Sequence, residues 1–147
     1  MPGLIGKKVG MTSVFDENGN IKQEKNETNL IVNTGLNFMA SRMKDATSDV
    51  MSHMGLGSNN TAPNATDTDL GTLLGSRVAL TSTTVTDNEV EYIATFSAGE
   101  ATGAVVEAGI FNAVSSGDML CRTTFDVVNK SASDSIQITW TITLSAS

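Results

Sequence analysis

The stretch DSIQITWTITL, residues 134–144, decides the fold of this 147-residue chain. Single polar residues separate its apolar ones, which are Ile136, Ile138, Trp140, Ile142 and Leu144. Because successive side chains of a strand point to opposite faces, this alternation predicts a β-strand with one buried face. A slip of one residue would turn all five apolar side chains to water, so we expect this strand to fix the register of its neighbours.

Further strand-like segments precede it at short spacing, at residues 50–56, 77–86, 89–96, 105–112 and 119–128. Along the last of these, alternation predicts one common face made by Met119, Cys121, Phe125 and Val127. Small turns join most of the segments, and the helical crossovers of a parallel sheet are missing. The pattern therefore predicts an all-β, mainly antiparallel domain, either a β-sandwich or a jelly roll.

One segment has helical rather than strand periodicity. Leu36, Met39, Ala40 and Met43 recur at intervals of three and four, which predicts an amphipathic helix near residues 33–45. We expect Asn33 or Thr34 to cap its first turn.

Residue types that commonly carry chemistry are scarce and isolated. His53 is the only histidine, and Cys121, the only cysteine, lies in an apolar strand pattern typical of a buried thiol. Asp67 and Asp69 are expected to cap a short helix at residues 70–74, since two carboxylates lack the further oxygen ligands of a calcium loop. We expect no catalytic residue, no metal and no cofactor, and hence a protein that is not an enzyme.

Residues 1–27 are expected to form a β-hairpin arm, and residues 28–147 the β-sandwich domain. The arm has a strand around residues 7–15, a turn at Asn18-Gly19 and a return strand from Ile21. An isolated hairpin is marginal in water, so the arm either packs on its own domain or reaches a neighbouring subunit. For the second alternative we predict a partner-binding set: Leu4, Ile5, Lys7, Lys8, Val9, Val14 and Phe15.

Charge is unevenly distributed along the chain, whose formal net charge is -7. Residues 1–44 hold six Lys or Arg against four Asp or Glu, whereas the remainder holds three against twelve. The acidic remainder argues against nucleic-acid binding.

No apolar run approaches the roughly 20 residues that a membrane helix needs, and the N-terminus lacks the apolar core of a signal peptide. We expect a protein made in the cytoplasm that binds neither membrane nor nucleic acid.

Two stretches resemble known families. GLIGKKVGMTSVFDENG, residues 3–19, resembles the N-terminus of bacterial ribosomal protein uL3, which implies rRNA contact through Lys7 and Lys8; the resemblance ends by Glu27. From Thr28 onward the chain resembles small structural proteins of tailed-bacteriophage virions. The phrases that carry this second resemblance are NLIVNTGL (29–36), GLGSNNTAP (55–63), TDTDLGTLLGSRVAL (66–80), EVEYIATFSAGEATGAVVEAGIFN (89–112) and MLCRTTFDVVNKSASDSIQITWTITL (119–144).

The phage resemblance implies a virion protein, first of all a capsid decoration or cement protein. Such a protein would be a homotrimer on the outer surface of the capsid and would stabilise the head by binding adjacent subunits of the major capsid protein. One alternative is a tail-fibre or adhesin module that recognises a host receptor or glycan. A third is an RNA-binding protein related to ribosomal protein uL3.

Overall fold

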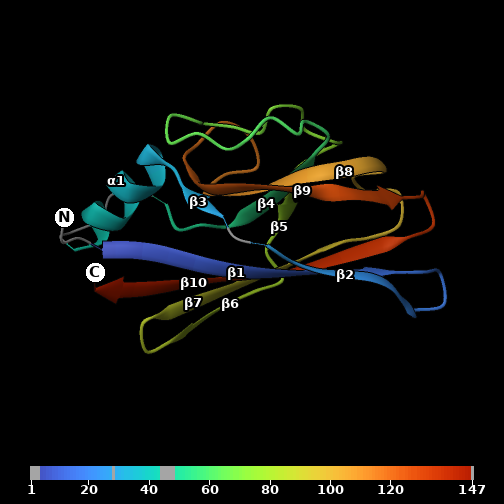
Figure 1. Cartoon of the computed structure of the whole chain (residues 1–147), viewed down its shortest axis with the longest axis horizontal. Coiled ribbons are helices and arrows are strands. Elements are labelled where there is room, and N and C mark those ends of the chain that lie inside the picture. The colour runs from blue at the N-terminus through green and yellow to red at the C-terminus, as the bar shows by residue number, and fades with distance from the viewer. Residues whose placement is uncertain (1–3, 28, 44–48, 147) are drawn as a thin grey trace.

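The computed structural model describes residues 4–27, 29–43 and 49–146, with side chains at 13–24, 27, 29–43 and 49–144. Within them, two five-stranded sheets form the two layers of a sandwich (Figure 1). The described strand pairings are antiparallel. The all-β, sandwich-like fold with one helix, expected from the sequence, is confirmed.

The first sheet, sheet A, has the strand order β2-β1-β10-β7-β6. Its strands are β1 Leu4–Phe15, β2 Ile21–Glu27, β6 Ser82–Thr86, β7 Glu89–Phe96 and β10 Ser135–Ala146. Sheet B has the order β3-β9-β8-β4-β5. Its strands are β3 Leu30–Ile31, β4 His53–Gly57, β5 Val78–Ala79, β8 Gly103–Phe111 and β9 Met119–Lys130.

Strand β10 is the middle strand of sheet A, as its sequence pattern indicated. Ile136, Ile138, Trp140 and Ile142 are each at most 4% exposed and belong to the main core, while Leu144 is half-buried at its margin. Trp140 lies between Gly10 on β1 and Tyr92 on β7. A glycine on one side leaves room for the indole ring next to the neighbouring backbone.

Strand β1 runs antiparallel to β10 along its whole length, from Leu4 opposite Ala146 to Phe15 opposite Ser135. It therefore lies between β2 and β10, inside the sheet of its own chain (Figure 1). Val14, near its end, is 2% exposed and packs in the core. Two alternatives were expected for residues 1–27. The backbone pairing of β1 with β10 corresponds to the first, in which the hairpin packs on its own domain.

The expected helix is present as α1, Asn33–Arg42, and residues 44 and 45 of the predicted range lie outside the described part of the chain. The predicted side-chain cap is wrong, because Val32 occupies the N-cap position and no side chain caps the helix. Thr34 Oγ1 instead donates to the Met119 carbonyl at 2.6 Å, which ties the first turn to β9. At Gly35 a Cβ would overlap the Leu120 carbonyl, so only glycine allows this close approach.

The helix expected at residues 70–74 is not formed. This segment bends at Gly71 and Thr72, whose amides donate to Glu107 instead of entering a helical turn, and Leu73 then bridges to Gly57.

Two strand predictions also needed correction. Residues 77–86 form two strands, β5 and β6, rather than one. Val127 was expected on the buried face of its strand but is 49% exposed, whereas Val128 is buried. The change of phase coincides with an irregularity in the ladder, because the register between β8 and β9 shifts between Val105 and Glu107.

Candidate functional site

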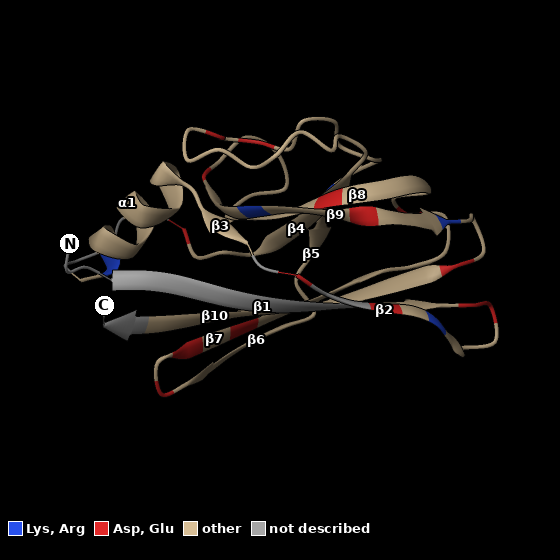
Figure 2. Ribbon diagram, in the orientation of Figure 1, with Lys and Arg blue, Asp and Glu red and all other residues tan. Residues whose placement is uncertain are grey.

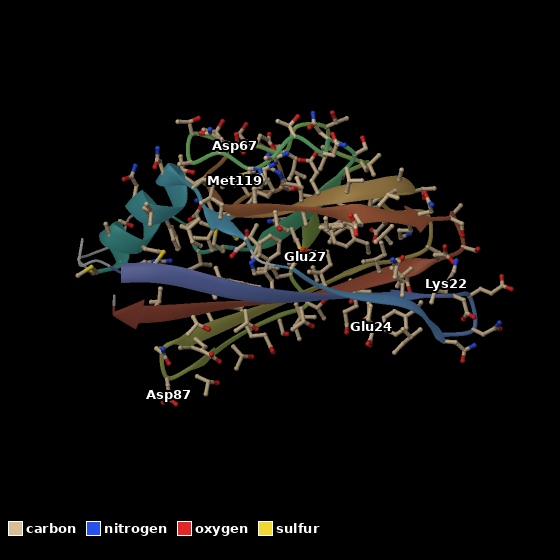
Figure 3. The ribbon with its side chains drawn as sticks, viewed as in Figure 1. Lys22, Glu24, Glu27, Asp67, Asp87 and Met119 are labelled. Atoms are coloured by element: carbon tan, nitrogen blue, oxygen red, sulfur yellow. The ribbon has the colours of Figure 1, made fainter. Side chains whose placement is uncertain are left out.

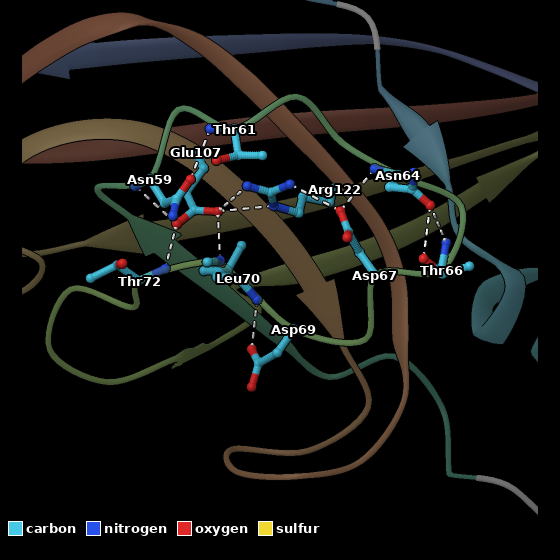
Figure 4. Close-up of polar contacts among 11 residues, drawn as sticks. Asn59, Thr61, Asn64, Thr66, Asp67, Asp69, Leu70, Thr72, Glu107 and Arg122 are labelled. Carbon is cyan, nitrogen blue, oxygen red and sulfur yellow. Dashed lines mark hydrogen bonds and ion pairs between the residues drawn. The ribbon is translucent and has the colours of Figure 1, made fainter.

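An extensive polar cluster fixes the long loop between β4 and β5 onto sheet B (Figure 4). Its centre is Glu107 on β8, a carboxylate that is fully buried. Glu107 Oε1 accepts from the amides of Asn59 at 3.1 Å and Thr72 at 2.9 Å, and Oε2 from the amide of Gly71 at 3.0 Å. One carboxylate thus accepts hydrogen bonds from backbone N–H groups at both ends of the loop. Burying these N–H groups without an acceptor would cost free energy.

Arg122 on β9 supplies the positive charge for this cluster. Its Nη2 and Nε atoms lie 2.7 Å and 2.9 Å from Glu107 Oε2, and its Nη1 lies 2.9 Å from Asp67 Oδ2 in the loop. A second guanidinium, that of Arg77, contacts Asp69 at 3.0 Å and stacks over the Phe111 ring at 3.4 Å. Asp67 and Asp69 are therefore ion-pair partners that fix the loop, not helix caps.

Replacing Glu107 with glutamine should show how strongly this cluster fixes the loop. Glu107→Gln keeps the shape but removes the charge, places an amide NH2 group among donors, and leaves Arg122 with Asp67 as its partner. Because hydrogen bonds to charged groups contribute about 1.5–3 kcal/mol, we expect the free energy of unfolding to fall by about 2–3 kcal/mol. Urea denaturation measures this change, and amide hydrogen exchange should quicken at Asn59, Gly71 and Thr72 first.

The matched control is Glu17→Gln, which makes the same change at an exposed turn residue. It should shift the unfolding free energy by less than about 0.5 kcal/mol. Equal effects of the two substitutions would show that the Glu107 cluster does not fix the loop.

A second buried charge, Lys130, holds the other end of the sandwich together. Its Nζ donates to the carbonyls of Ser97 at 3.0 Å and Asp134 at 2.7 Å, and burial lowers the pKa of this ammonium group. The Asp134 carboxylate accepts from the amide of Ser131 and from Lys22 Nζ on β2. These contacts lower the pKa of Asp134 to about 2. The contacts connect β2, β9 and the turn before β10, so they are structural.

The isolated reactive residues are not gathered into a site. Cys121 is buried and forms no disulfide, and His53 Nδ1 lies 2.8 Å from the hydroxyl of the adjacent Ser52. Burial raises the pKa of Tyr92 to about 12, so its phenol stays protonated near neutral pH. In the described part of the chain, no three His, Cys, Asp or Glu side chains converge as metal ligands would.

An apolar groove of about 440 Å³ lies between α1 and the ends of β7 and β10. Its walls are formed by Leu36, Phe38, Met39, Ala40, Arg42, Met43, Val90, Tyr92, Leu120, Ile142 and Leu144. Arg42 stacks on Phe38 at 5.1 Å, which places a positive charge beside the groove. The groove could bury an apolar side chain, and none of the described residues that line it is a general acid or base near neutral pH.

A second candidate surface is the side of the β1–β2 hairpin that carries the exposed Ile21. Ile21, the first residue of β2, is 57% exposed and pairs with the half-buried Phe15 of β1. The register places Ile5, Lys7 and Val9 opposite Ser145, Thr143 and Thr141 of β10. These positions alternate along the strand with the buried ones, so they belong to the side of sheet A that faces away from the core. We call this set (Ile5, Lys7, Val9, Phe15 and Ile21) the hairpin face.

The seven residues predicted to bind a partner are thus divided between the two faces of sheet A. Leu4 and Lys8 lie opposite Ala146 and Ile142, in the rows of the core face, and Val14 is itself buried in the core. The side chains of Leu4, Ile5, Lys7, Lys8 and Val9 lie outside the described residues, so partner binding by them stays a prediction.

Sequence reasoning missed Ile21 and the Glu107–Arg122 pair. A signal for the pair was available, since VVEAGIF and MLCRTTF each place one charge inside an apolar strand, and the two charges have opposite sign. Buried charges are almost always paired, so the two segments could have been predicted to be neighbours. Ile21 carried no comparable signal, because its exposure depends on the position of β2 at the edge of sheet A.

Comparison of the chain with protein-family models, with curated proteins and with solved structures gives no match. Among the described residues, no helix has the length and apolar character needed to cross a membrane.

Proposed function

We propose that this chain is a virion structural protein, a decoration or cement protein that binds adjacent major capsid subunits from the outside of the head. The proposal rests on the resemblance of the chain after Thr28 to small structural proteins of tailed phages. A rigid two-layer sandwich suits this role, because it presents fixed surfaces to a lattice of identical subunits and needs no reactive site.

The observation that carries the proposal furthest is the exposed side chain of Ile21 on the hairpin face. Ile21 is 57% exposed beside Phe15, and the register aligns both with Ile5 and Val9 along the same side of sheet A. Apolar residues grouped on one surface are typical of a protein–protein contact. We propose that this face lies on the capsid, with apolar burial supplying affinity and Lys7 approaching acidic groups of the capsid subunits.

Addition of the protein to particles that lack it, followed by a count of bound copies, tests this proposal. The wild-type chain should bind in hundreds of copies per head. Ile21→Asp places a charge in the proposed contact while changing an exposed residue, so we expect at least about a tenfold loss of affinity with little change in stability.

Val114→Asp is the matched control, because Val114 is 56% exposed but lies in the turn between β8 and β9. It should bind particles like the wild type. Equal binding by Ile21→Asp would contradict use of the hairpin face. A handful of copies per particle would favour a tail component over a capsid protein.

A further inference from the structure

Strand β6 is an open edge of sheet A. All five of its residues, Ser82–Thr86, are exposed, and β6 pairs with β7 on one side only. Val85 is 68% exposed, one of the most exposed large apolar side chains among the described residues. An edge strand presents a row of backbone N–H and C=O groups without sheet partners, which is a template for another strand.

The other three edge strands, β2, β3 and β5, have features that natural proteins use against such pairing. The edges of sheet B are β3 and β5, which have two residues each. The opposite edge of sheet A, β2, carries charges of both signs, with Lys22, Glu24 and Glu27 along it (Figure 3). Strand β6 has neither protection, since its sequence STTVT contains no charged residue and no proline (Figure 2).

We propose that β6 pairs with β6 of a second copy of this chain, antiparallel and around a two-fold axis, so that the two A sheets become one continuous sheet. Around an axis at Thr84 the register is self-complementary, placing Ser82 opposite Thr86 and Thr83 opposite Val85 of the other copy. Cross-strand pairs of Thr, Ser and β-branched residues are favourable, and no like charges meet within the strand.

Charges around the edge predict how this association responds to salt. Asp87 lies at the end of the β6–β7 hairpin (Figure 3). Glu89 and Glu91 follow on the adjacent strand, β7. Two copies that pair through β6 bring these acidic groups together, so added salt should strengthen the pairing. The short contact predicts a weak dimer that forms at high concentration.

Thr84→Lys tests the pairing without disturbing the fold. In the dimer it would place two like charges opposite each other at the two-fold axis, while within one copy the new lysine stands opposite Glu91. The matched control is Thr141→Lys, because Thr141 also pairs with Glu91 but lies on β10 in the middle of the sheet. Both variants change the net charge equally.

Sedimentation equilibrium over a concentration series should show a monomer–dimer equilibrium for the full-length chain, stronger at raised salt. Thr84→Lys should raise the dissociation constant about fivefold or more, and Thr141→Lys should leave it within about twofold. Amide exchange at residues 82–86 should slow as concentration rises.

A chain that stays monomeric at the highest concentration reached would overturn the proposal, as would equal effects of the two substitutions. A trimer that Thr84→Lys dissociates would also overturn it, because two-fold pairing joins only two copies. None of these outcomes depends on capsid binding, so this inference and the proposed function can fail independently.

Discussion

Removing residues 1–27 is expected to leave a chain that no longer folds cooperatively. The deletion takes away β1, which pairs with β10 over twelve residues, and turns the middle strand of sheet A into an open edge. It also removes Val14 from the core, the Lys22–Asp134 ion pair, and the backbone of Gly10 beside Trp140. Losing two of five strands from one layer uncovers apolar surface whose burial drives folding.

Far-UV circular dichroism and thermal melting of the truncated chain measure this effect. We expect no cooperative transition, or one at a much lower temperature, and association through the exposed β10 edge. Adding a peptide of residues 4–27 should restore part of the transition, because it supplies the missing strands. A truncated chain that melts near the temperature of the full-length protein would instead show that residues 1–27 are a separable arm.

Local sequence patterns predicted some elements of the sandwich but not the place of β1 in sheet A. The alternation along β10 and the helical spacing in α1 were strong local signals, and both elements form where they were predicted. Strand β1 was predicted from residue 7 onward, but the sequence did not identify its core face, because the core-face positions include Gly6, Lys8 and Gly10. Its place in sheet A follows from the register with β10, a strand more than a hundred residues later, and local periodicity contains no information about such a pairing.

The loop between β4 and β5 shows a similar limit. Asp67 and Asp69 have the local pattern of helix caps, yet their partners are guanidinium groups on Arg122 and Arg77. Glu107 binds loop amides that lie 35, 36 and 48 residues away in the sequence. These long-range charged hydrogen bonds outweigh the weak helical preference of residues 70–74.

The hairpin face was predicted in part. The sequence identified apolar residues and lysines near the N-terminus as a binding set, but the strand register was needed to separate Ile5, Lys7 and Val9 from Lys8 and Val14. A two-residue periodicity makes neighbouring residues face opposite ways, so a binding set drawn from consecutive strand residues always mixes the two faces.

The largest effect of a single substitution is expected at Trp140. Its side chain is among the largest that are fully buried, and residues of β1 and β7 lie on either side of it. Trp140→Ala removes the ring and leaves a cavity that the two sheets cannot close, so the free energy of unfolding should fall by about 3–5 kcal/mol. Trp140 is the only tryptophan, so urea unfolding should be followed by circular dichroism rather than by fluorescence.

Thr141→Ala is the matched control on the opposite face of the same strand, where truncation removes little buried surface. We expect a change of less than about 1 kcal/mol there, which isolates burial of the indole from any general loss of strand propensity. Trp140→Phe should fall between the two, because a smaller ring leaves a smaller cavity. If Trp140→Ala costs less than about 1 kcal/mol, the apolar face of β10 is not the sealed core between the sheets, and the face would have to border solvent or another subunit.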